Sequence, residues 1–109
     1  MAIQLSEIIK KWVPENSKVI DFGCGNGSLL DELIIDKNIL GYGVEINDLK
    51  IAECIQKGVP VIKQDIDKGI NEFISSNFDL SIMARSIQCL KNPDLALNEM
   101  LQISKRCVV

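Results

Sequence analysis

The amino-acid sequence predicts a single α/β domain in which a parallel β-sheet carries helices on both faces. Short apolar, β-prone runs alternate along the chain with segments whose apolar residues recur at helical spacing, the pattern of repeated β-α units. A glycine-rich turn separates the first of these runs from the helix after it. With 109 residues, 47% of them apolar and 25% charged, the chain has the length and composition of one ordered globular domain.

The first predicted element is an amphipathic helix that ends before Pro14 and packs on the sheet. Its apolar face is expected at Leu5, Ile8, Ile9 and Trp12. Residues 18–22 form the first predicted strand, and the glycine-rich turn leads from it into a second helix. The apolar face of that helix is expected at Leu29, Leu30, Leu33 and Ile34.

The β-α unit then repeats. Residues 39–45 are a second apolar strand, and Asn47 or Asp48 can cap the following helix, which ends at Gly58. The apolar face of this helix is expected at Leu49, Ala52 and Ile55. A third strand follows over residues 59–63.

The third strand contains Pro60, which indicates an edge position because proline cannot donate a ladder hydrogen bond. A short helical segment is expected after it, around Ile70 and Phe73. Residues 78–83 are the fourth strand. The next helix begins at Asn92 and Pro93, a cap followed by proline at the first helical position. Its apolar face is expected at Leu97, Met100 and Leu101.

A fifth strand begins within residues 105–109, where the chain ends without a covering helix. We therefore expect the N-terminal part of a longer protein. Right-handed crossovers between the parallel strands predict the sheet order 3-2-1-4-5, which is a Rossmann-like doubly wound sheet. In such a sheet the ligand site falls beyond the C-terminal ends of strands one and four.

The glycine-rich turn is the first candidate site. Gly23, Gly25 and Gly27 stand between strand and helix, where the missing Cβ atoms permit a sharp turn and let a ligand approach the backbone N–H groups. A nucleotide-like ligand is indicated. The alternative is that the glycines serve only the packing of a tight strand-to-helix turn.

Two acids add to this candidate site. Glu45 closes the second strand, where a carboxylate can accept hydrogen bonds from both hydroxyls of a ribose. Asp65 follows the third strand and could accept from an adenine amino group while Ile66 lies against the ring. The alternatives are a solvated strand end for Glu45 and a helix N-cap for Asp65.

The type of nucleotide follows from two further positions. An NAD fingerprint that begins at Gly23 requires Gly or Ala at position 28, where the chain has Ser28. The carboxylate of Asp21 at the mouth of the turn suits a cationic group such as the amino end of S-adenosylmethionine better than a pyrophosphate. S-adenosylmethionine is therefore favoured, and an NAD-type domain is the less favoured alternative.

The run from Asp21 to Gly27 resembles motif I of class I methyltransferases, and Glu45 and Asp65 fall at that family's ribose and adenine positions. More narrowly, residues 19–30, 41–45 and 64–69 resemble the methionine biosynthesis protein MetW family, and residues 86–88 and 92–94 continue the match. Ala84 and Arg85 depart from that pattern, in which Ser and Gln are expected.

The resemblance implies a class I methyltransferase-like domain over residues 1–109 that acts in methionine biosynthesis and associates with a homoserine O-acyltransferase. The cofactor-binding residues that it implies for S-adenosylmethionine are Asp21, Gly23, Cys24, Gly25, Gly27, Glu45, Ile46, Asp65 and Ile66. Two functions stay open: a methyltransferase whose small-molecule acceptor is unknown, and a non-catalytic module that senses the ligand and regulates the acyltransferase.

No catalytic residue is identified. Arg85, Ser86 and Gln88, which follow the fourth strand, could face a carboxylate-bearing substrate or a partner, but residues after a strand are more often caps and solvated turn positions. Cys24 and Cys89 are interpreted as packing residues, because the chain contains no histidine to activate a thiol.

Composition argues against several other classes of protein. The net charge is −3 and the twelve Lys and Arg residues are scattered, so no nucleic-acid footprint is expected. The four cysteines form no C-x-x-C pair, so we expect no metal site and a reducing, cytoplasmic location. No apolar run approaches the roughly 18 residues of a membrane span, so no membrane is expected as a partner. The exposed edge of the fifth strand could pair two copies of the chain.

Overall fold

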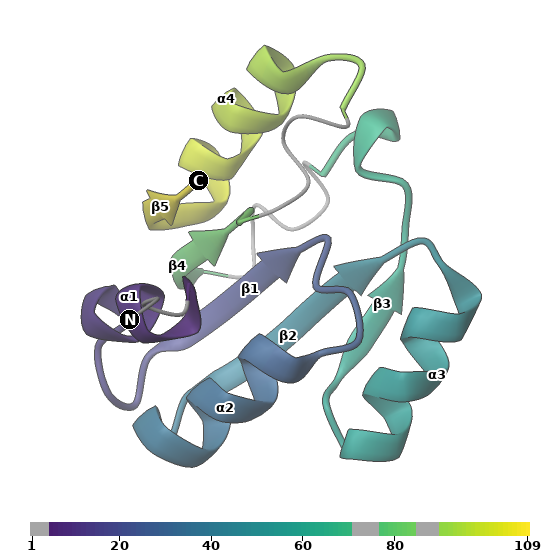
Figure 1. The fold of residues 1–109 in the computed structure, drawn as a ribbon. Helices are drawn as coiled ribbons and strands as arrows, with labels where there is room; N and C mark the ends of the chain where they lie inside the picture. The colour runs from purple at the N-terminus through teal and green to yellow at the C-terminus, as the bar shows by residue number, and fades with distance from the viewer. Residues whose placement is uncertain (1–4, 71–76, 85–89) are drawn as a thin grey trace.

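The computed structural model describes residues 5–70, 77–84 and 90–109 and contains five strands and four α-helices (Figure 1). In chain order the elements are α1 (Leu5–Trp12), β1 (Lys18–Phe22), α2 (Ser28–Lys37), β2 (Leu40–Glu45), α3 (Asp48–Lys57), β3 (Val61–Lys63), the 3₁₀ turn η1 (Ile66–Lys68), β4 (Phe78–Ile82), α4 (Pro93–Ile103) and β5 (Ser104–Val108). None of the helices in the described part is long and apolar enough to cross a lipid bilayer.

The strands form one parallel sheet in the order β3-β2-β1-β4-β5. This confirms the predicted order and the edge position of β3. β1 lies at the centre, where Asp21 pairs with Gly43 of β2 on one side and with Ile82 of β4 on the other. The C-terminal ends of β1, β2 and β3 therefore lie next to one another, and the turns after these strands share one edge of the sheet.

Helices cover both faces of the sheet, as predicted for a doubly wound fold. One core cluster joins side chains of α1, α2 and α3 to Val19 of β1. A second cluster joins α4 to Ile20 and Phe22 of the same strand. Val19 and Ile20 enter different clusters because successive side chains of a strand point to opposite faces of the sheet. Figure 1 shows α2 and α3 together on the side of the sheet away from α4.

The helix ends agree with the sequence signals. The side chain of Asn47 accepts a hydrogen bond from the backbone N–H of Lys50 at 3.1 Å and caps α3, and Gly58 closes the helix with a left-handed φ of 78°. The side chain of Asn92 accepts from the N–H of Leu95 at 3.3 Å and caps α4, in which Pro93 is the first residue. These caps satisfy N–H groups that a helix start leaves without partners.

The predicted apolar faces of three helices are wrong in part or in whole. Among the α1 side chains whose burial is described, from Ser6 to Trp12, Ile9 is buried, whereas Trp12 is 56% exposed and lies beside the end of β5. In α3 the whole predicted face is wrong, because Leu49, Ala52 and Ile55 are all exposed and the side chain that enters the core is Cys54. In α4, Leu101 is exposed, and the buried residues are Ala96, Glu99, Met100 and Ile103. Each helix carries apolar residues on more than one face, so periodicity alone did not identify the face that meets the sheet.

Some expectations fall outside the described residues. They concern the helical segment around Phe73 and the residues that follow β4: Arg85, Ser86, Gln88 and Cys89.

The carboxylate of Asp79 ties the start of β1 to β4. Its Oδ2 accepts a hydrogen bond from the backbone N–H of Lys18 at 2.8 Å, and Lys105 Nζ lies 3.6 Å from Oδ1. The hydrogen bond from the Lys18 N–H, aided by the charge of Lys105, holds the pKa of Asp79 below its usual value of 3.8.

Because the pKa of Asp79 is lower in the folded protein, this group stabilises the fold above the unfolded pKa and loses that contribution as the pH falls through the folded pKa. We expect the free energy of unfolding of Asp79→Asn to change less with pH below about 4 than that of the wild type. Urea unfolding between pH 2 and 6 measures the difference, in roughly the range where carboxylates titrate. Equal pH profiles for the two proteins would contradict the prediction.

Candidate functional site

The glycine turn follows β1 and is built against the end of β2. Gly23, Gly25 and Gly27 adopt positive φ angles of 78°, 60° and 83°, a region that residues with a Cβ rarely adopt. The N–H groups of Gly23 and Cys24 both donate to the carbonyl oxygen of Val44, at 2.7 and 3.1 Å. The sequence therefore requires glycine here for the path of the backbone, independent of any ligand.

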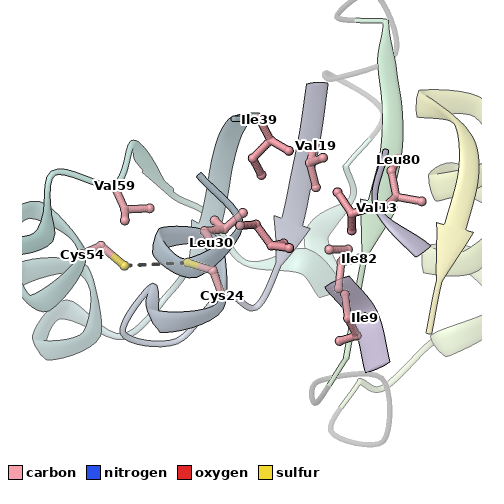
Figure 2. Close-up of a cluster of buried hydrophobic side chains, with 11 residues drawn as sticks. Ile9, Val13, Val19, Cys24, Leu30, Ile39, Cys54, Val59, Leu80 and Ile82 are labelled. Atoms are coloured by element: carbon pink, nitrogen blue, oxygen red, sulfur yellow. Dashed lines mark hydrogen bonds between the residues drawn. The ribbon is translucent and has the colours of Figure 1, made fainter. Parts of the chain in front are cut away.

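The turn is packed tightly on its inner side. Cys24 and Cys54 approach to 3.9 Å between their Sγ atoms, and both thiols lie near the carbonyl oxygen of Gly25, that of Cys54 at 3.2 Å. Figure 2 shows the two side chains pointing toward each other, Cys24 from the turn and Cys54 from α3, beside Leu30. A Cβ on Gly27 would lie 3.0 Å from Cys54 Sγ. The inner face of the turn is thus filled by protein.

The two cysteines are packing residues. Burial, followed by the neighbouring Cys54 and the charge of Asp21, raises the pKa of the Cys24 thiol far above neutrality. Burial likewise raises the pKa of Cys54. Because the thiolate is the nucleophilic form, neither group is suited to covalent catalysis.

Glu45 holds the turn in place through its side chain. Its Oε1 accepts a hydrogen bond from the N–H of Gly25 at 2.9 Å, and its Oε2 accepts from the N–H groups of Ile46 and Asn47 at 3.0 and 2.9 Å. The carboxylate therefore links the glycine turn after β1 to the loop after β2. Glu45 is half-buried and bonded to the turn, so it is more than a solvated strand end.

A pocket of about 440 Å³ opens beside the turn. Four of the predicted site residues line it: Asp21, Gly23, Cys24 and Gly25. Asp21 is almost fully buried, with 4% of its surface exposed. Gly27, Glu45, Ile46, Asp65 and Ile66 lie outside this lining.

Sequence reasoning missed the other residues that line the pocket: Ser6, Asn26, Ser28, Leu29, Glu32, Lys50 and Ala84. Glu32 stands one helical turn after Ser28 on α2, and that spacing places both on the face that meets the pocket. The spacing is a signal for Glu32, but it does not by itself show which face of α2 meets the pocket. The wall of the pocket carries two carboxylates, Asp21 and Glu32, and one ammonium group, Lys50.

Asp65 and Ile66 lie in the segment after β3, next to the loop of Glu45. Gln64 N–H donates to the carbonyl oxygen of Glu45 at 3.1 Å, which places this segment beside the end of β2. The Oδ1 of Asp65 accepts from the N–H of Asp67 at 3.0 Å, so Asp65 is the N-cap of η1. Ile66 is half-buried and packs on the α4 core cluster.

The backbone N–H groups of the turn are used inside the protein, contrary to expectation. Those of Gly23 and Cys24 donate to Val44, that of Gly25 to Glu45, and that of Gly27 to the carbonyl oxygen of Cys24 at 3.2 Å. A pyrophosphate that binds such a turn requires N–H groups directed at it. The turn instead offers a ligand the Cβ-free surface of its glycines.

Within the described part of the chain, no group of three or more Cys, Asp or Glu side chains could hold a metal ion.

Comparison with known families matches residues 4–109 to the model of the methionine biosynthesis protein MetW. The chain belongs to the MetW family. It is 31% identical over 111 residues to the bifunctional methionine biosynthesis protein MetXA/MetW of Rhodopirellula baltica, a match that covers 94% of this chain and 18% of that protein. This MetW family member thus spans less than a fifth of the length of the curated relatives that it matches.

Solved structures confirm the fold. A TehB-like S-adenosylmethionine-dependent methyltransferase from Corynebacterium glutamicum superposes with a TM-score of 0.76 at 21% identity, over 91% of this chain and 55% of that one. A second methyltransferase, from Thiobacillus denitrificans in complex with S-adenosyl-L-homocysteine, gives a TM-score of 0.75 at 15% identity, over 91% of this chain and 43% of that one. The domain has the Rossmann-like fold of class I methyltransferases.

Proposed function

We propose that this MetW family member binds S-adenosylmethionine and its product S-adenosylhomocysteine over the glycine turn. The observation that carries the proposal is the pocket beside the turn, which brings the buried carboxylate of Asp21 together with the open surface of Gly23 and Gly25. A ligand with an ammonium group and a positive sulfur suits this wall, because carboxylates stabilise a positive charge in a site of reduced polarity. The shared fold and the bound product in the Thiobacillus denitrificans protein support the same ligand.

The proposed ligand would extend across the C-terminal ends of three neighbouring strands. Asp21 and Glu32 would accept hydrogen bonds from its amino group, and the carboxylate of Glu45 would accept from its ribose. Asp65 and Ile66 would meet the adenine. When bound, S-adenosylmethionine supplies an electrophilic methyl group on a sulfonium; the residues of this chain bind and orient it.

The hydrogen bonds of Glu45 refine the ribose contact. A carboxylate has about four lone-pair sites, two on each oxygen. In this structure Oε2 already accepts two N–H groups and Oε1 accepts one. One ribose hydroxyl can therefore take the remaining site on Oε1, beside the bond from Gly25, and no free site is left for a second hydroxyl.

An NAD-type ligand is disfavoured by the same structure. The N–H groups of Gly23, Cys24, Gly25 and Gly27 are engaged within the protein. In the pocket beside them two carboxylates, Asp21 and Glu32, outnumber the one ammonium group, Lys50, that could face a pyrophosphate. We expect NAD to bind at least 100-fold more weakly than S-adenosylhomocysteine, which corresponds to roughly 3 kcal/mol.

The Glu45→Ala variant tests the proposal. Removing the carboxylate deletes the ribose acceptor and frees the N–H of Gly25, so we expect the dissociation constant of S-adenosylhomocysteine to rise by about tenfold to 100-fold. Isothermal titration of the wild type with S-adenosylmethionine, S-adenosylhomocysteine and NAD measures the affinity and the selectivity. Glu15→Ala is the control, because Glu15 is an exposed acid before β1. A folded wild type that binds neither sulfur nucleoside would reject the proposed ligand.

A second candidate function is regulation of a homoserine O-acyltransferase. The observation that favours it is the Rhodopirellula baltica relative, whose name joins MetXA and MetW in one bifunctional protein. Formation of S-adenosylhomocysteine by the whole protein, with and without the acyltransferase, separates the two functions. Turnover that is independent of the partner supports a methyltransferase, whereas a ligand-dependent change in acyltransferase rate without methyl transfer supports a sensor.

A further inference from the structure

Glu99 carries a buried carboxylate and is not among the residues proposed to contact the ligand. It lies in the middle of α4 with 9% of its surface exposed. Its Oε2 accepts a hydrogen bond from the backbone N–H of Ile70 at 2.8 Å, and the Cβ position of Gly69 lies 3.9 Å from both of its oxygens. Carboxylates are rarely buried unless hydrogen bonds compensate for lost hydration, so the position of this side chain depends on the contact with residues 69–70.

The chain before Ile70 is the segment that carries Asp65 and Ile66. It is shaped locally by the side chain of Asp65 at the start of η1 and by the Nε2 of Gln64, which donates to the carbonyl oxygen of Gly69 at 2.7 Å. These bonds close the segment on itself. They do not determine where it lies relative to α4.

Two hydrogen bonds tie this segment to the later part of the described chain. The Oδ1 of Asp67 accepts from the N–H of Lys91 at 2.9 Å at an exposed position, and Glu99 accepts from Ile70 at a buried one. Ile66 and Ile70 pack in the same core cluster as Met100, the residue after Glu99. Glu99 therefore projects from a helix that is packed in the core, and a shift of residues 69–70 would move Ile66 and Asp65 with them.

We propose that Glu99 is a positioning residue for the adenine side of the site. Its carboxylate accepts the hydrogen bond from the N–H of Ile70 and so fixes the position of residues 65–70 relative to the sheet. In that position Asp65 and Ile66 face the ligand. This role rests on the proposed function, since it assumes that Asp65 accepts from the adenine amino group. Glu99 itself makes no contact with the ligand.

The first test is made on the ligand-free chain. Hydrogen exchange of the backbone amide of Ile70 is expected to accelerate about tenfold or more in Glu99→Ala and less in Glu99→Gln, because the glutamine oxygen can still accept that bond without the charge. Ile103→Val is the matched control, since it removes one buried methyl group from the same helix and leaves the contact with Ile70 in place. Unchanged exchange at Ile70 in both Glu99 variants would overturn the proposal.

The second test measures recognition of the adenine. S-adenosylhomocysteine is compared with S-inosylhomocysteine, in which an oxygen replaces the 6-amino group. We expect the wild type and Ile103→Val to prefer the adenosine form by about tenfold or more. Glu99→Ala should reduce that preference to within about threefold, with Glu99→Gln between the two.

The outcomes are distinguishable. If the wild type and the Glu99 variants prefer S-adenosylhomocysteine over S-inosylhomocysteine equally, the positioning role is overturned and the proposed ligand is unaffected. A wild type that binds neither compound overturns the proposed function and this inference with it. A loss of preference in Ile103→Val equal to that in Glu99→Ala would assign the effect to general stability and would also overturn the inference. Glu99→Gln keeps the test valid if the alanine variant fails to fold.

Discussion

Gly43→Ala is expected to destabilise the domain by about 3 kcal/mol and to abolish ligand binding, because the new methyl group has no space. It would overlap the Sγ of Cys24 and lie 3.0 Å from the Cβ of the same residue. β2 cannot move to relieve the overlap, since Gly43 pairs with Asp21 of β1 on one side and with Val61 of β3 on the other. The turn must move instead, and the wall of the pocket moves with it. Urea unfolding and titration with S-adenosylhomocysteine measure the two effects.

Two variants make this prediction specific. Gly41 lies two residues earlier on β2, and its added methyl group would meet only the ends of flexible side chains, at 3.2–3.4 Å. Gly41→Ala should therefore lower the free energy of unfolding by less than about 1 kcal/mol. Adding Cys24→Ala to Gly43→Ala removes the sulfur and should recover a large part of the lost stability, a coupling that a double-mutant cycle measures. Equal effects of the two glycine substitutions would show that the contact with Cys24 is not responsible.

Leu30→Ala is expected to lower the free energy of unfolding by about 3 kcal/mol, within the usual range for a leucine removed from a core. Leu30 is fully buried in the cluster beneath the glycine turn, and its methyl groups lie 3.3 Å from the Cβ positions of both Gly41 and Gly43. These two glycines present no side chain that could fill the space. For a domain of this size the loss corresponds to a decrease in Tm of roughly 15 °C.

Ile35→Ala is the control for Leu30→Ala on the same helix. Ile35 is 73% exposed, so its truncation should change the free energy of unfolding by no more than about 0.5 kcal/mol. Thermal unfolding followed by circular dichroism compares the two variants. A Leu30→Ala protein as stable as Ile35→Ala would mean that the cluster under the turn rearranges to fill the cavity.

The strands and their order could be predicted because their signals are local and because parallel crossovers restrict the topology. Pro60 identified the edge strand, and Asn47, Gly58 and Asn92 identified helix ends, each through a backbone requirement that a single residue expresses. The buried faces of α1, α3 and α4 could not be predicted in the same way. Leu49 and Ile55 are larger and more apolar than Cys54, yet α3 turns Cys54 to the core, where its Sγ lies 3.0 Å from the Cβ position of Gly27.

The site could be predicted in part for a related reason. Asp21 and the glycines follow a strand directly, so their place at the edge of the sheet follows from the order of elements. Glu32 and Lys50 come from two different helices and join the pocket only through the packing of those helices. Glu99 could not be predicted at all, because a charged residue in a helix is normally found on the solvent side.

The hydrogen bonds between the glycine turn and the end of β2 affect the entropy of ligand binding. The carbonyl oxygen of Val44 receives two N–H groups from the glycine turn, and Glu45 receives a third. Binding loops usually belong to the least stable parts of a fold and lose conformational freedom when a ligand orders them. Here the loop is already ordered as an extension of the sheet, so a ligand meets a rigid surface and little of its binding free energy is consumed in shaping that surface.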